Sequence, residues 1–201
     1  MTFIVVEGGE GAGKSTQVGR LVARLRDAGY ADRGIVKTRE PGGTQRSLEL
    51  RQQLLHDPRG VDPATELDLM LLDRAIHLED KIKPALARGS VVVCDRFTPS
   101  TIAYQGVGRG LGVEEVERRC LDLAGYVEPD VVIVLDLPDD VAEGRVAGSR
   151  DRFEREGDEF HSAVRNAYRE LAPSRGWVIV DASGSADAVA DRVWAVVKRV
   201  L

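Results

Sequence analysis

An apolar run, Phe3-Ile4-Val5-Val6, leads into the glycine-rich stretch Gly8-Gly9-Glu10-Gly11-Ala12-Gly13-Lys14-Ser15. Apolar side chains then recur from Val18 to Leu25 at the spacing of one helix face, and Gly29 follows them. The order of strand, loop and helix, with Gly-x4-Gly-Lys-Ser at its centre, predicts a phosphate-binding loop. An ordinary glycine-rich turn would account for the glycines but not for a lysine and a serine at this offset.

This loop predicts a site for ATP and Mg²⁺. Glycines allow successive backbone N–H groups to point at anionic oxygens, because no Cβ blocks the approach. We expect Lys14 to neutralise the β and γ phosphates and the Ser15 hydroxyl to hold Mg²⁺. The residues expected around ATP are Gly8, Glu10, Gly11, Ala12, Gly13, Lys14, Ser15 and Thr16.

The composition favours one domain spanning residues 1–201, with 43% apolar and 30% charged residues. No long uncharged apolar run or export signal is visible, and Cys94 lies within an apolar run, so we expect a cytoplasmic protein that does not enter membranes. The net charge of −5 argues against a nucleic-acid polymer as partner, because such polymers favour a basic face.

Apolar runs rich in valine and isoleucine recur along the chain, at residues 3–6, 35–38, 91–94, 131–135 and 177–180. Helical patterns separate them, which predicts an α/β fold in which a parallel sheet is covered by helices on both faces. We expect one long helix from Pro63 to Lys83, capped by Asp62 and ended by Pro84. A last helix is expected over 187–199.

Charged residues follow two of these runs directly. Asp95 and Arg96 come after the third, where we expect the carboxylate to position Mg²⁺ through water and the arginine to grip the transferring phosphate. Arg39 and Glu40 follow the second, and Arg51 lies on the next helix. Convergence of the three arginines would create a second phosphate site, and therefore a phosphorylated acceptor. A structural Asp-Arg pair and scattered surface arginines are the alternatives.

The segment from Arg150 to Glu159 carries eight charged residues in ten, so we expect it to stay out of the core. It is either a solvated turn or a mobile lid that brings arginines over ATP.

Several motifs together resemble thymidylate kinases of the bacterial type. They are Glu7 to Ser15, Thr38-Arg39-Glu40-Pro41-Gly42-Gly43-Thr44, Asp95-Arg96-Phe97 with Ser100-Thr101-x-Ala103-Tyr104-Gln105-Gly106, and the Asp-Arg pair of the charged segment. The resemblance runs from Phe3 to at least Tyr168. It implies a P-loop NTPase fold with a five-stranded parallel sheet, transfer of the ATP γ-phosphate to dTMP to give dTDP, and a homodimer.

The resemblance also implies roles for individual side chains. Arg39, Arg51 and Arg96 would hold the acceptor phosphate, with Glu40 beside them. Arg74 and Gln105 would bind thymine, and Thr101 would add a polar contact. Tyr104 would crowd the ribose 2′ position, Glu10 would lie near the 3′-hydroxyl, and Arg150 and Arg152 would act from a lid over about 144–160.

One position departs from the family pattern. Met70 stands where the family usually stacks a phenylalanine on thymine, so it either covers the base or only packs its helix. The three histidines, His56, His77 and His161, have no metal-binding spacing and are interpreted as ordinary surface or core residues. The alternative functions are another P-loop nucleoside monophosphate or deoxynucleoside kinase, and a phosphate-loop switch that hydrolyses ATP without an acceptor.

Overall fold

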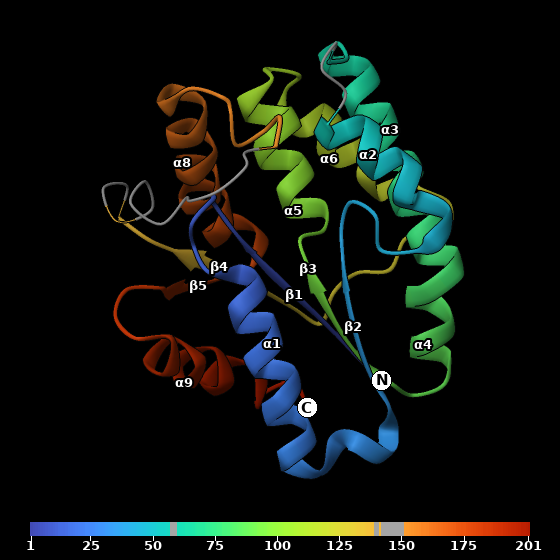
Figure 1. Cartoon of the computed structure of the whole chain (residues 1–201), viewed down its shortest axis with the longest axis vertical. Helices are drawn as coiled ribbons and strands as arrows, with labels where there is room; N and C mark the ends of the chain where they lie inside the picture. Colours follow the sequence, from blue (N-terminus) through green and yellow to red (C-terminus); the bar gives the residue numbers. More distant parts are fainter. Residues whose placement is uncertain (57–59, 139–140, 142–150) are drawn as a thin grey trace.

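The computed structural model describes residues 1–56, 60–138, 141 and 151–201, and its centre is a five-stranded parallel sheet (Figure 1). The strands are β1 (Thr2–Gly8), β2 (Ile35–Arg39), β3 (Val91–Asp95), β4 (Val131–Asp136) and β5 (Val178–Asp181). They lie in the order β2-β3-β1-β4-β5, and every neighbouring pair is parallel. The expected strands and the parallel sheet are therefore confirmed.

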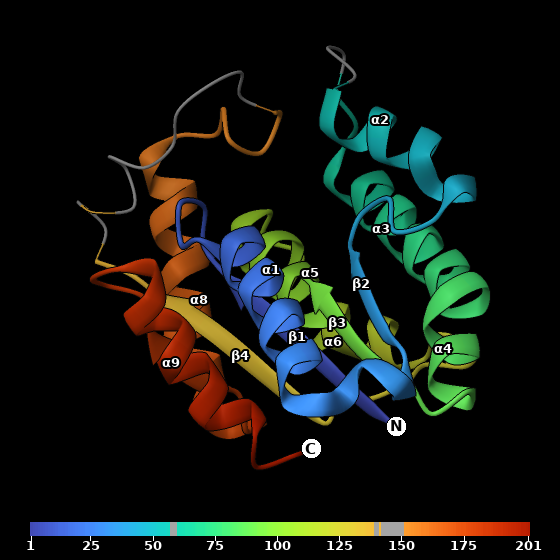
Figure 2. The same ribbon diagram turned by 60° about the horizontal axis from the view of Figure 1, so that its bottom comes forward.

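Helices cover both faces of this sheet (Figure 2). They are α1 (Lys14–Leu25), α2 (Leu48–His56), α3 (Pro63–His77), α4 (Lys83–Ala87), α5 (Thr98–Thr101), α6 (Val113–Leu121), α8 (Asp158–Arg175) and α9 (Ala186–Val197). Shorter π or 3₁₀ turns span Arg26–Tyr30, Ala31–Arg33, Gln45–Ser47, Leu78–Ile82 and Ile102–Gly108.

Side chains of β1 alternate between two hydrophobic layers. Ile4 and Val6 pack with α1 and α9, whereas Phe3 and Val5 pack with α4 and α8 on the opposite face. Burial on both faces explains why β3 and β4 carry consecutive apolar residues, Val91 to Cys94 and Val131 to Leu135, rather than alternating ones, whereas the edge strand β2 leaves Lys37 exposed.

The long helix expected to end at Pro84 continues. Asp62 caps it as expected, accepting hydrogen bonds of 3.1 Å from the backbone N–H groups of Ala64 and Thr65. From α3 the chain passes through the π turn Leu78–Ile82 into α4, which ends at Ala87. Pro84 falls in the first turn of α4, where the missing N–H of proline is tolerated.

The strand register brings the polar strand ends together. Arg39 pairs with Asp95 across β2 and β3, and Val6 pairs with Asp95 across β1 and β3. The loops that follow these three strands therefore meet at one edge of the sheet, which is where open α/β sheets bind ligands.

The charged segment from Arg150 to Glu159 was expected to stay out of the core, and this expectation was wrong for Phe153. Its ring is 5% exposed and packs among core residues. The neighbouring Arg152 donates from its backbone and from Nε to the carbonyls of Leu55 and Leu54, both at 2.9 Å. Because the last carbonyls of a helix lack intrahelical partners, the end of α2 can bind this segment despite its charge. Arg150 lies outside the described residues.

Within the described residues, no helix combines the length and apolarity needed to cross a lipid bilayer.

Candidate active site

A cavity of about 340 Å³ opens at the carboxyl edge of the sheet. The predicted site residues that line it are Glu10, Gly11, Gly13, Lys14, Ser15, Thr16, Arg39, Glu40, Arg51, Met70, Arg74, Asp95, Arg96, Thr101, Tyr104 and Gln105. Other lining residues include Pro41, Leu55, Asp73, Phe97, Ser100, Asp151, Phe153 and Glu154. Gly8 and Ala12 are buried and are not among the lining residues. One continuous space thus joins the phosphate loop to the arginines and to α3.

The phosphate loop turns into α1 through Gly13, which has a φ of 84° and lies in the left-handed region that glycine adopts freely. Lys14 is 8% exposed, and its Nζ donates to the carbonyl of Gly9 at 2.7 Å. Burial, followed by the nearby Arg96 charge, lowers the pKa of Lys14. A desolvated lysine at the N-terminus of a helix is well placed to meet phosphate oxygens.

The two predicted magnesium residues lie side by side. The Ser15 hydroxyl donates to Oδ2 of Asp95 at 2.7 Å. A hydroxyl and a carboxylate are the oxygen donors that Mg²⁺ prefers, so this pair fits the ion. Among the described residues, no three histidine, cysteine or acidic side chains are arranged so that they could hold a metal ion, so Mg²⁺ at this position would draw its other ligands from phosphate and water.

Arg96 occupies the centre of the site on a strained backbone. Its φ is 70°, a left-handed value that is uncommon for a residue with a side chain. Its guanidinium pairs with Glu10 and donates to the hydroxyls of Tyr104 and Ser100, both at 3.1 Å. Burial alone raises the pKa of Glu10, but the charges of Arg96 and Lys14 outweigh it and lower that pKa to about 2. Glu10 is therefore ionised and holds the arginine in place.

Arg39, Arg51 and Arg96 all line the cavity, as expected for an anion site. Nη1 of Arg51 donates to the carbonyl of Pro41 at 2.6 Å. Burial and then the like charge of Arg39 lower the pKa of Arg51. Repulsion between neighbouring cations is relieved when an anion binds between them.

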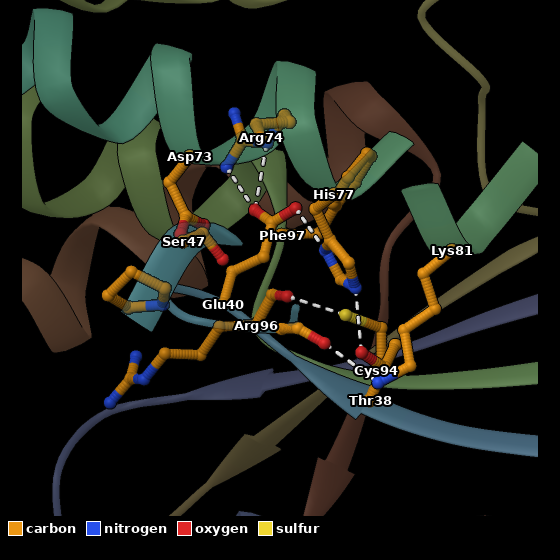
Figure 3. A network of polar contacts seen from close by, with 12 residues as sticks. Thr38, Glu40, Ser47, Asp73, Arg74, His77, Lys81, Cys94, Arg96 and Phe97 are labelled. Carbon is orange, nitrogen blue, oxygen red and sulfur yellow. Dashed lines mark hydrogen bonds and ion pairs between the residues drawn. The ribbon is translucent and has the colours of Figure 1, made fainter. Parts of the chain in front are cut away.

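Arg74 is 2% exposed and lines the acceptor side of the cavity. Its Nε donates to Glu40 at 2.9 Å (Figure 3). Its Nη2 donates to Thr101 at 2.8 Å. The guanidinium also lies 4.7 Å from the ring centroid of Phe97. Burial raises the pKa of Glu40, yet the charge of Arg74 and the bond to His77 lower it further than burial raises it. The pair is thus an ionised carboxylate and a fixed guanidinium.

Gln105 and Arg152 meet at Glu66, a fully buried residue of α3. Nε2 of Gln105 and Nη2 of Arg152 both donate to the Glu66 carboxylate at 2.7 Å, and Arg109 binds it at 3.2 Å. Arg152, which was expected to act from a lid over ATP, is therefore already paired with this buried carboxylate.

Sequence reasoning gave no functional role to four buried polar residues around the site. Glu7 accepts from the backbone of Phe97 at 2.7 Å, and burial raises its pKa. The others are Glu66, Asp73 and His77. A usable signal was present for His77, which follows Arg74 by three positions and so shares its helix face.

A phosphate loop at the edge of a parallel sheet, joined to a second cationic pocket, defines a P-loop kinase of small phosphorylated substrates.

The thymidylate kinase family model matches residues 6–193. A thymidylate kinase of Synechococcus sp. is 49% identical over 98% of this chain and 94% of its own length. One of Solidesulfovibrio magneticus is 45% identical, covering 99% of this chain and all of its own. The crystal structure of thymidylate kinase from Ehrlichia chaffeensis has a TM-score of 0.81 at 29% identity, covering 98% of both chains. The chain belongs to the thymidylate kinase family.

Proposed function

We propose that the chain transfers the γ-phosphate of ATP to dTMP, giving dTDP and ADP, as a step in dTTP synthesis. The observation that carries this proposal is that Lys14, the three arginines and the buried Arg74 all line one continuous cavity. Its two halves suit a triphosphate donor and a phosphorylated acceptor.

In the donor half, the phosphate loop binds ATP through its backbone N–H groups and Lys14. Ser15 and Asp95 would hold Mg²⁺, which neutralises charge on the phosphates when it is bound. Arg96 lies beside this pair and stabilises the charge that develops on the transferring group.

In the acceptor half, Arg39 and Arg51 share the phosphate of dTMP with Arg96. A phosphate monoester has a second pKa of about 6 and presents an anionic oxygen near neutral pH. The acceptor therefore needs no general base, and positioning with charge neutralisation is enough for transfer.

The base lies between α3 and the turn Ile102–Gly108. Arg74 donates to the thymine edge, the Gln105 amide donates to it or accepts from it, Thr101 adds a polar contact and Met70 covers the ring. Tyr104 excludes a ribose 2′-hydroxyl.

Glu10, which is fixed by Arg96 and by a 3.0 Å bond from Tyr104, lies near the 3′-hydroxyl.

We further propose a lid over about 144–160, a homodimer in which the exposed Leu72 of α3 is covered, and a cytoplasmic setting.

A panel of acceptors with Mg-ATP tests the assignment. Hydrogen-bonding groups arranged for one base are left unpaired by another, which can reduce kcat/KM by up to about 10⁴ to 10⁵. We expect dTMP to be preferred, dUMP to be weaker because it loses only apolar contact, and dCMP and dGMP to be very poor. Comparable rates for dCMP or dGMP would indicate a different monophosphate kinase, and turnover without any acceptor would indicate a switch.

A further inference from the structure

We propose that His77 is a positioning residue for Arg74, because it holds the Glu40 carboxylate in the orientation that fixes the arginine in the acceptor pocket. The inference rests on the proposed function, in which Arg74 binds the base. His77 does not line the cavity and would act only through its neighbours.

Both ring nitrogens of His77 are engaged in the interior. The side chain is fully buried on α3, three positions after Arg74. Its Nδ1 lies 2.9 Å from Oε1 of Glu40, and its Nε2 lies 2.7 Å from Oγ1 of Thr38 (Figure 3). The ring therefore links the helix that carries Arg74 to the end of β2.

The chemistry of these partners assigns the proton on the ring. Glu40 is an ionised carboxylate and only accepts, so Nδ1 of His77 carries the hydrogen and donates it. In the neutral ring Nε2 is then an acceptor, and the Thr38 hydroxyl donates to it. Thr38 thereby selects the tautomer that Glu40 requires.

The two oxygens of Glu40 accept hydrogen bonds from different residues. Oε1 accepts from His77, and Oε2 accepts from Nε of Arg74 at 2.9 Å. A carboxylate bound on only one oxygen can rotate about its terminal torsion, whereas one bound on both sides is held. Loss of the His77 bond would therefore let the carboxylate rotate and weaken its bond to Nε, so that the angle of the guanidinium would be set only by its remaining contacts, such as the bond to Thr101.

The backbone also fixes the imidazole. A Cβ placed on Gly43 would lie 2.5 Å from Nε2 of His77, so the loop after β2 rests directly against the ring. Lys81 supports the same loop by donating to the Gly43 carbonyl at 2.7 Å. The ring has little freedom to move, which suits a group that sets the angle of another.

Matched substitutions separate positioning from packing. In His77→Asn, the amide nitrogen lies close to the position of Nδ1 and keeps the bond to Glu40. In His77→Gln, the amide extends toward Thr38 and the bond to Glu40 is lost. Thr38→Val removes the donor to Nε2, and Thr38→Ser retains it. For each variant, kcat and KM for dTMP and for ATP, the dTMP-to-dCMP preference and the urea midpoint would be measured.

We expect His77→Gln and Thr38→Val to lose roughly 10- to 100-fold in kcat/KM for dTMP, since small misplacements at a binding group cost up to about 10². The dTMP-to-dCMP preference should fall with it, while the KM for ATP stays unchanged. His77→Asn and Thr38→Ser should retain most of the preference.

Equal losses in His77→Asn and His77→Gln, or a lower urea midpoint with an unchanged base preference, would overturn the proposal and leave His77 as packing. Failure of the wild-type chain to phosphorylate dTMP would instead refute the proposed function. If His77→Gln does not fold, the Thr38 pair decides by the same criteria.

Discussion

Replacing Arg96 with alanine and, separately, with glycine distinguishes the role of its side chain from the strain in its backbone. A left-handed conformation costs a residue with a Cβ about 1 to 2 kcal/mol, and the φ of Arg96 is 70°. Glycine avoids this cost but gives up roughly 0.5 to 1 kcal/mol through the greater freedom of its unfolded chain. We therefore expect the glycine variant to be more stable than the alanine variant by about 0.5 to 1 kcal/mol.

Both variants lose the guanidinium equally. Glu10 would lose the cation beside it, and its pKa would rise from about 2 toward its ordinary value of 4.5. At about 1.36 kcal/mol per pKa unit, this weakens folding near neutral pH by up to about 3 kcal/mol in each variant. Because an arginine on a transferring phosphoryl group can be worth roughly 10³ to 10⁵ in kcat, we expect losses of that size in both.

Urea unfolding at pH 7 and steady-state turnover with dTMP and ATP provide the two measurements. Arg96→Lys serves as the control, because it keeps the charge but not the planar fork, and should recover only part of kcat. An alanine variant as stable as the glycine variant would refute the strained backbone. A kcat within about tenfold of wild type would refute the role of Arg96 in phosphoryl transfer.

Four further changes test other parts of the site. Lys14→Ala should leave a folded chain with almost no phosphoryl transfer, and an unchanged kcat would contradict the role of the phosphate loop. Arg51→Ala should raise the KM for dTMP. An effect confined to the KM for ATP would show that Arg51 acts in the donor half of the cavity and not in the acceptor half. Burial raises the pKa of Asp73 to about 6 from 3.8. Its contribution to the free energy of unfolding is therefore full below pH 3.8 and falls by about 3 kcal/mol as pH rises through 6. Asp73→Asn should remove this decrease in stability with pH in unfolding experiments between pH 4.5 and 7.5. Glu66→Gln should weaken the hold on Arg152 and speed amide exchange over 151–156 in the nucleotide-free protein, and equal exchange in wild type and variant would show that this ion pair does not anchor the segment.

The fold could be predicted closely because its signals are local. A strand that is buried on both faces is apolar at consecutive positions, so the central strands were visible as runs such as Val91 to Cys94. The predictions were wrong where a tertiary contact overrode the local sequence pattern. Pro84 was expected to end a helix that a π turn carries past it, and Phe153 was expected outside a core that accepts it.

Much of the candidate site was equally visible, because parallel strands deliver their ends to one edge. Arg39 and Asp95 could be assigned to the same edge because each ends a predicted parallel strand, and the structure shows that they pair directly across β2 and β3. Polar residues inside helices were different. Glu66 and His77 look like ordinary exposed or core positions, because periodicity does not reveal which buried carboxylate or ring finds a partner 30 or more positions away.

The sequence by itself determined the layered α/β architecture, the phosphate loop and the set of charged residues at the strand ends, because each depends on chain-local geometry and on the direction of parallel strands. Only the tertiary structure decided how those side chains are held. It paired Glu10 with Arg96, Glu40 with Arg74 and His77, and Glu66 with Gln105. A buried charge must find a partner to offset its desolvation, and which partner is within reach is settled by the packing of elements that lie far apart in the chain.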